Sequence, residues 1–284
     1  MTGVQRKSDL RGGLRRLPLS AWVLVVFAVV GSIGPFLPGI DPLTQDLTSR
    51  LRPPAFLDGG TWDHPLGTDQ LGRDVLARLV VGCRLSLMIA SLSVLLGAAF
   101  GTLLGLLAGY RRGPVDIVIS RLTETQLVFP SILLAMAIVT SVGRSLPVIV
   151  VTLAIIGWAQ YARVVRAEVM SLRERPFVRG LEAAGMGPAR IMVRHLLPNV
   201  LNTILVLGSL QVGHMLLAES AMGFLGIGLA PPATSWGVML AESRSFLETA
   251  PWLAVIPGLL ITLVVLSINF FGDRLRHRHD PRSR

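Results

Sequence analysis

Residues Phe177 to Asn199 read FVRGLEAAGMGPARIMVRHLLPN. The stretch places alanines and glycines between arginines and ends in Leu-Pro-Asn, whereas long apolar runs dominate the chain on either side of it. Its role therefore depends on what those runs are, and on which side of them the stretch lies.

The composition is that of a membrane protein. Of the 284 residues, 51% are apolar and 15% are charged, whereas a soluble domain carries about 25% charged residues. Because charged residues are few, long uncharged runs separate them. Most of these runs reach the ~20 residues that a helix needs to cross the hydrocarbon core. Six of these runs are predicted membrane spans: Leu17–Ile40, Leu85–Tyr110, Thr125–Gly143, Ser145–Ala162, His195–Ala218 and Thr249–Gly272.

A seventh uncharged run, Ser220–Ala241, is not expected to span. It contains three glycines followed by the pair Pro231–Pro232, and such a backbone cannot stay helical across a bilayer. Broken backbone is tolerated at membrane depth only where protein or water shields it. We therefore expect an extramembrane or re-entrant loop here, and an all-α integral membrane protein with six transmembrane helices.

The basic residues predict the orientation of the spans, because Lys and Arg favour the cytoplasmic side. Six spans place both termini on one side, and both termini are basic, so both are expected in the cytoplasm. The first span is expected to be retained as a signal anchor. Most of the 27 Lys and Arg residues lie in the tail before Leu17, Arg111–Arg121, Arg163–Arg194 and Arg274–Arg284.

The net charge of +10 is explained by these short segments facing anionic lipid headgroups, so membrane lipids rather than nucleic acid are the expected partner. Cys83 is the only cysteine, which excludes a disulfide framework and a thiolate metal site. Asp63–His64 is too small a ligand set for a metal and is interpreted as a turn. No hydrolase motif is present, so the chain is not expected to be an enzyme.

A helix is predicted after the first span, within His64–Leu79. Thr68 or Asp69 can cap its start. Leu71, Val75 and Leu79 then share one face, with Arg73, Asp74 and Arg78 on the others. This pattern predicts an amphipathic helix lying in the membrane interface before the second span.

The second span carries glycines at every fourth residue, which form a groove that lets another helix approach closely. The partner helix could belong to this chain, which is the simpler interpretation, or to another subunit. These glycines are Gly97, Gly101, Gly105 and Gly109.

The six spans contain no Asp, Glu, Lys or Arg, which weakens an ion-coupled mechanism without excluding it. His214 is expected to be a hydrogen-bonded packing residue rather than a proton carrier. A phosphate-binding loop needs a lysine in GxxxxGK[ST], and the only lysine is Lys7. If ATP drives the protein, another subunit must bind it.

The segment between the fourth and fifth spans is predicted to be two short helices joined by a glycine turn. Pro176 suits the first turn of the first helix, Gly185 can end it in a left-handed conformation, and Pro188 can begin the second. Phe177, Leu181 and Ala184 would share one face of the first helix. From the residues alone, this cytoplasmic segment is either a docking element for another protein or a simple connecting loop.

The same segment resembles the EAA loop of ABC-importer permeases, which has the form EAA-x3-G-x9-I-x-LP and forms the coupling helix that docks on the ATPase. Gly185 and Leu197–Pro198 match the register of that motif, and Pro198 is expected to kink the start of the fifth span. The triplet departs from the motif: Arg179–Leu181 stand at its register, and Glu182–Ala184 lie three residues late. The residues assigned to the coupling loop are Phe177, Arg179, Gly180, Leu181, Glu182, Ala183, Ala184, Gly185, Met186 and Pro198.

Three further stretches, His64–Leu79, Glu219–Gly237 and Asn269–Arg282, resemble the C-type subunit of the dipeptide/oligopeptide/nickel permease family. The resemblance implies a type I ABC-importer permease fold in the bacterial plasma membrane. It also implies a second related permease, one or two cytoplasmic ATPase subunits that bind ATP and Mg, and an extracytoplasmic substrate-binding protein. The residues expected to contact that binding protein or to gate the outer mouth are Asp69, Arg73, Asp74, Glu219 and Trp236.

Three regions follow from this interpretation. Residues 1–83 hold the cytoplasmic tail, the first span and the outer segment, residues 84–273 form a permease core of five helices, and residues 274–284 form a basic cytoplasmic tail. Di- or oligopeptides are the expected cargo, with nickel or another small solute as the alternative. An ion-coupled secondary transporter or channel that works alone remains the rival from another class, and a membrane assembly or signalling subunit is a third possibility.

Overall fold

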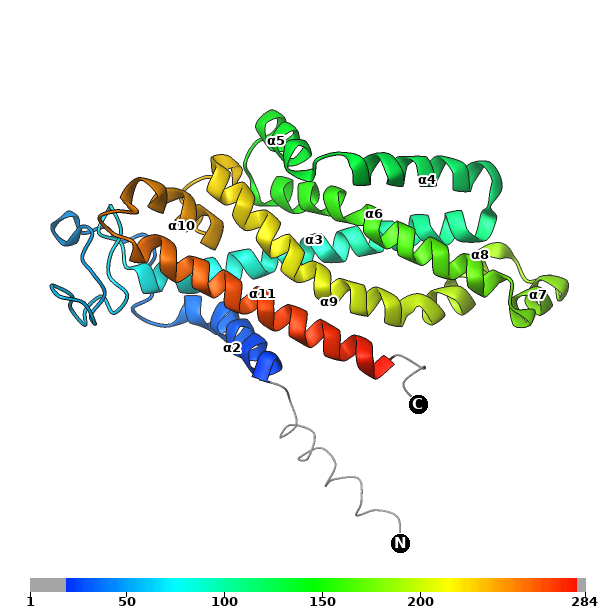
Figure 1. Cartoon of the computed structure of the whole chain (residues 1–284), viewed down its shortest axis with the longest axis horizontal. Helices are drawn as coiled ribbons and strands as arrows, with labels where there is room; N and C mark the ends of the chain where they lie inside the picture. Colours follow the sequence, from blue (N-terminus) through cyan, green and yellow to red (C-terminus); the bar gives the residue numbers. More distant parts are fainter. Residues whose placement is uncertain (1–18, 280–284) are drawn as a thin grey trace, which may run out of the picture.

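The computed structural model describes residues 19–279, and the side chains of residues 19–274. The two expected tails therefore lie largely outside the described residues. Every regular element in the described range is a helix (Figure 1). The helices are α2 (Leu19–Ile33), α3 (Val75–Arg111), α4 (Gly113–Val128), α5 (Ser131–Val142), α6 (Leu146–Arg173), α7 (Pro176–Ala183), α8 (Pro188–Ile191), α9 (Leu197–Met222), α10 (Trp236–Ser243) and α11 (Trp252–His279).

Five helical segments within the described range are long and apolar enough to cross a membrane, and a bent pair of helices brings the number to six. The five segments are Leu19–Phe36, Val75–Arg111, Leu146–Arg173, Pro188–Ile227 and Trp252–Arg274. The all-α class and the count of up to six spans agree with the sequence-based expectation.

The third predicted span is not one straight helix. Its residues are divided between α4 and α5, which meet at an angle of 93°. The break lies at Phe129, whose backbone is extended (φ −71°, ψ 132°), directly before Pro130. A residue that precedes proline is pushed out of the helical region, and the proline itself has no N–H for a helical hydrogen bond.

The expected amphipathic helix before the second span is also not present as a separate element. The Asp69 carboxylate accepts hydrogen bonds from the N–H groups of Leu71 and Arg73, and Gly72 adopts a left-handed backbone (φ +74°). These contacts make a turn, so Leu71 precedes the helix instead of lying on its face. The helix begins at Val75, where the Asp74 side chain caps it by accepting from Ala77 N–H at 2.8 Å.

From Val75, α3 continues for 37 residues without a break. The outer segment and the second span are therefore one element. The expected boundary between residues 83 and 84 falls inside this helix and does not separate two folding units.

The glycines of α3 lie against α6, its most extensive neighbour. An added Cβ at Gly101 would lie 2.2 Å from the carbonyl oxygen of Trp158, and one at Gly105 would lie 2.8 Å from that of Ala162. Gly97 and Gly109 face the same helix at 3.2 and 2.8 Å from backbone oxygens. The four glycines thus let two helices of this chain approach closely, so the groove is filled within the chain.

The remaining long helices complete the bundle. Helix α9 packs against α3, α6 and α11, and α2 packs against α3 and α11 (Figure 1). Two ends of the bundle are defined by their short helices: α7 and α8 mark one, called the α7 end, and α10 with residues 41–74 marks the other, called the α10 end.

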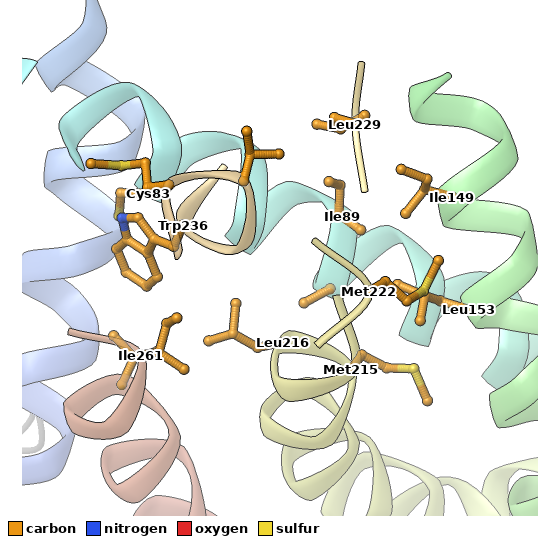
Figure 2. Packing of buried hydrophobic residues seen from close by; sticks show 14 of the residues in the cluster. Cys83, Ile89, Ile149, Leu153, Met215, Leu216, Met222, Leu229, Trp236 and Ile261 are labelled. Carbon is orange, nitrogen blue, oxygen red and sulfur yellow. The ribbon is translucent and has the colours of Figure 1, made fainter. Parts of the chain in front are cut away.

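The backbone breaks at the α10 end, within the run that was expected not to span. Helix α9 continues to Met222, passes through one wide turn at Gly223–Ile227, and gives way to a loop that leads into α10. Gly226 has φ +83°, a conformation that glycine adopts without steric cost. The loop folds back onto the bundle, so that Trp236 is fully buried beside Cys83 in the apolar core (Figure 2).

Candidate functional site

The segment between α6 and α9 has the predicted helix–turn–helix form. Helix α7 begins with Pro176 in its first turn. At its end, Gly185 has φ +76°, its N–H donates to Glu182 O, and Met186 N–H donates to Leu181 O. Pro188 then begins α8. A wide helical turn, Met192–Leu196, leads into α9, whose first turn contains Pro198.

The structure shows which side of α7 is buried. Val178 is completely buried, and Leu181 and Met186 are partly buried in an apolar cluster with Leu172 and Ile191. Of the three residues expected to share one face, Phe177 is 42% exposed and Ala184 is exposed as well, whereas Leu181 turns partly into the cluster. In so short a helix, the direction of the inward face is decided by the packing of α6 and α8, which helical spacing alone does not reveal.

Two carboxylates hold α7 to the bundle. The Tyr110 hydroxyl at the end of α3 donates a 2.8 Å hydrogen bond to Glu182, and Arg173 of α6 lies 3.9 Å from the same carboxylate. Glu182 therefore has a definite role in the fold, although its triplet is displaced from the expected register.

The second carboxylate, Glu174, accepts from Arg179 at 2.6 Å and also pairs with Arg112. These hydrogen bonds lower the pKa of Glu174 below its ordinary value, and the bond from Arg179 has the largest effect. Through these two arginines, Glu174 connects α7 with the ends of α6 and α3.

The outward surface of this segment consists of small side chains beside Phe177. Gly180, Ala183, Ala184 and Gly185 are all exposed, and no atom lies within 4 Å of an added Cβ at Gly180 or Gly185. Such a surface allows a partner's backbone to approach closely, with the Phe177 ring as an apolar contact. Of the other residues assigned to the loop, Arg179, Glu182 and Pro198 are exposed.

A cluster of buried ion pairs lies at the α10 end. Asp69 contacts Arg73 at 2.6 Å and Arg78 at 2.5 Å, and Glu242 of α10 contacts the same two arginines at 2.9 and 2.7 Å. The cluster ties the start of α3 to α10. Arg78 and Glu242 were not selected as site residues from the sequence. The only sequence feature that pointed to the cluster was the position of Arg78 between apolar residues near the start of a span.

The residues expected to contact a binding protein or to gate the outer mouth are mostly internal. Trp236 is fully buried, with its indole N–H donating to Leu79 O at 3.0 Å. Glu219 is 1% exposed and accepts from the Ser86 hydroxyl at 3.2 Å. Asp69 and Arg73 belong to the buried ion cluster. A direct contact with another protein needs accessible atoms. These four buried residues therefore stabilise the α10 end through internal contacts.

Asp74, the fifth of these residues, caps α3 and also binds His64, whose Nδ1 lies 2.8 Å from its carboxylate. Asp63–His64 therefore lies in a turn that Asp74 fastens to α3. Within the described residues, no group of three or more His, Cys, Asp or Glu side chains is placed to hold a metal ion.

Comparison with known proteins identifies the family to which these features belong. Residues 101–284 match the model of the binding-protein-dependent transport system inner membrane component. The dipeptide transport system permease protein DppC of Haemophilus influenzae is 38% identical over 91% of this chain and 88% of its own length. The di/tripeptide permease DppC of Pseudomonas aeruginosa is 42% identical over 92% of this chain and 85% of its own length.

Two further comparisons extend the picture. The nickel transport system permease protein NikC of Escherichia coli K12 is 36% identical over 93% of both chains. A solved inward-facing structure of the MetNI methionine ABC transporter has a chain that superposes with a TM-score of 0.59 at 20% identity, covering 71% of this chain and 96% of that chain. That likeness concerns the fold. The chain belongs to the family of binding-protein-dependent transport system inner membrane components, as a relative of its peptide and nickel permeases.

Proposed function

We propose that this chain is one of two permease subunits of an ATP-driven importer, and that it forms with a second, related permease the path for di- or oligopeptides. The observation that carries the proposal is its similarity, over about nine-tenths of its length, to dipeptide and di/tripeptide permeases. The chain is a multi-pass membrane protein that provides a path rather than a catalytic centre.

The exposed surface of α7 and the following turn is the proposed docking site for the ATPase. Helix α7 protrudes at one end of the bundle (Figure 1), and its small residues Gly180, Ala183, Ala184 and the following Gly185 are exposed. The Tyr110–Glu182 and Glu174–Arg179 hydrogen bonds fix α7 to α3 and α6. A displacement of α7 by a partner would therefore be transmitted to two long helices. ATP and Mg would be bound by separate ATPase subunits, and this chain would hydrolyse nothing.

The α7 end is accordingly assigned to the cytoplasm, together with both termini. Arg111, Arg112, Arg173 and Arg175 lie at this end, which agrees with the preference of basic residues for the cytoplasmic side. The α10 end would then face the extracytoplasmic substrate-binding protein.

Nickel is the second candidate cargo, because the nickel permease NikC is similar to almost the whole chain. The two cargoes differ in an experiment that uses the intact complex. Labelled dipeptide and radioactive nickel would each be offered to proteoliposomes that contain the complex, its binding protein and internal ATP.

The decisive first experiment is a gentle-detergent pull-down of the tagged chain from its native membranes, followed by mass spectrometry. The proposal predicts a second permease and an ATPase that carries a phosphate-binding loop, and ATP-dependent uptake of dipeptide by the purified complex. A chain that purifies alone and transports without ATP would contradict the proposal and would favour an ion-coupled transporter.

A further inference from the structure

Four side chains with amide or imidazole groups gather midway along the bundle, where its long helices carry no Asp, Glu, Lys or Arg. Gln160 comes from α6, Gln211 and His214 from α9, and Asn269 from α11. They line a single pocket of about 240 Å³, together with apolar residues such as Leu210 and Val265. Helix α9 supplies most of the lining residues. It packs against both α6 and α11 and lies between them in Figure 1.

The hydrogen-bonding capacity of these four groups is not used within residues 19–274. Among the side chains that the structure describes, none of the four makes a hydrogen bond. Gln211 is 7% exposed and still lines the pocket, while Gln160, His214 and Asn269 are exposed. The expectation that His214 is a hydrogen-bonded packing residue is therefore not met in this structure.

A polar group left without a partner in hydrocarbon costs several kcal/mol. Four such groups on one face are stable only if that face meets water or a polar ligand instead of lipid. Exposed apolar side chains mark other surfaces of the long helices. On α3, for example, Leu95, Phe100 and Leu103 are exposed, as suits contact with lipid or with an apolar protein surface.

The chemistry of the pocket limits the class of ligand that it can bind. Its lining residues include no Asp, Glu, Lys or Arg, so the donors and acceptors of the pocket are carboxamide and imidazole groups. A carboxamide side chain presents the same N–H and C=O groups as a peptide bond. Such groups match the backbone of any peptide and are indifferent to the charge of its side chains.

We propose that Gln160, Gln211, His214 and Asn269 line the aqueous path of the cargo and form hydrogen bonds with the backbone amides of a passing peptide. This inference rests on the proposed function, because it assumes that the chain conducts peptides. The pocket is smaller than an oligopeptide, and the second permease would supply the opposite wall.

The first test measures access of water to these positions in the assembled complex. Gln160→Cys, His214→Cys and Asn269→Cys are each treated with a charged methanethiosulfonate reagent, and Leu95→Cys in the middle of α3 is the matched control. Because the reactive species is the thiolate, which lipid disfavours, we expect the three positions to react about tenfold faster than the control or more. The native Cys83 is 1% exposed and should contribute little background.

The second test adds cargo. A dipeptide, presented with the binding protein and ATP, is expected to slow the labelling of Asn269→Cys and His214→Cys and to leave Leu95→Cys unchanged. If the three positions react no faster than Leu95→Cys while the wild-type complex imports peptide, the path assignment is wrong and the proposed function stands. If they react rapidly and only nickel slows them, the path assignment stands and the peptide cargo is wrong.

Discussion

Asp69 is the acidic centre of the α10 end, since a single carboxylate accepts from two backbone N–H groups and pairs with two arginines. Arg78 is as deeply buried as Asp69. Burying charges is costly, and the cost is offset only when each charge has close partners. Glu242 provides the second partner for both arginines, so the cluster depends on residues from both α3 and α10.

We predict that Asp69→Asn destabilises the protein by about 3 kcal/mol, because removal of one partner leaves buried arginine charge with Glu242 alone. The measurement is unfolding of the purified protein in mixed detergent–SDS micelles. Asp58→Asn is the matched control, since Asp58 is exposed in the same outer segment. Equal stabilities of the two variants would show that the cluster contributes little.

Among the helices, α3 shows how far a local pattern can be interpreted. The glycine spacing predicted a close helix contact, and the structure identifies α6 as the partner. The start of α3 was predicted five or six residues early, because Thr68, Asp69 and Asp74 are all good caps and only the turn around Gly72 decides among them. Pro130 itself indicated a break in the third predicted span, but the apolar composition of the whole run favoured a single helix.

The glycines of α3 should differ in their tolerance of a methyl group. We predict that Gly101→Ala destabilises the bundle by roughly 1–3 kcal/mol, because the added Cβ collides with backbone and overpacks the contact. Gly97→Ala should cost less, since its nearest contact is 3.2 Å away instead of 2.2 Å. Thermal unfolding of the purified variants would rank them.

Gly258→Ala serves as the control for the effect of a methyl group in a helix. No atom lies within 4 Å of the Cβ position at Gly258 in α11, so alanine there should be neutral or slightly stabilising. A Gly101→Ala variant as stable as Gly258→Ala would mean that α3 and α6 are not held as closely as the structure shows.

In the molecule as a whole, a small exposed element lies at the α7 end and an ion-paired cluster lies at the α10 end, and long helices join them. The helix α3 connects the two ends directly, since its first residue follows the Asp74 cap and its last turn contains Tyr110, which binds Glu182. Movement of α7 can therefore reach the α10 end through one uninterrupted helix.

We predict that Gly185→Val uncouples ATP hydrolysis from uptake while the complex still assembles. A β-branched residue is strained at the left-handed φ of +76°, which would distort the exposed turn without disturbing the buried side of α7. Gly185→Asn is the control, because asparagine tolerates this conformation better. The ratio of peptide imported to ATP hydrolysed would be measured, and a normal ratio in Gly185→Val would contradict a role for this turn in coupling.

The sequence by itself determined that the chain crosses the membrane several times, that the backbone breaks after α9, and that the segment after α6 forms two short helices around Gly185. These features follow from local properties: uncharged length, the conformational freedom of glycine and the missing donor of proline. The motif resemblances in the same stretches indicated the family.

Only the tertiary structure decided which side chains meet. Asp69 and Glu242 bind the same two arginines from opposite parts of the chain, Val178 rather than Phe177 faces inward, and Trp236 is enclosed instead of presented. Gln160, Gln211, His214 and Asn269 converge on one pocket from three helices. Such side-chain contacts depend on the rotation of each helix about its axis and on the depth at which the helix packs. Both quantities are determined by all the long-range contacts of the fold together.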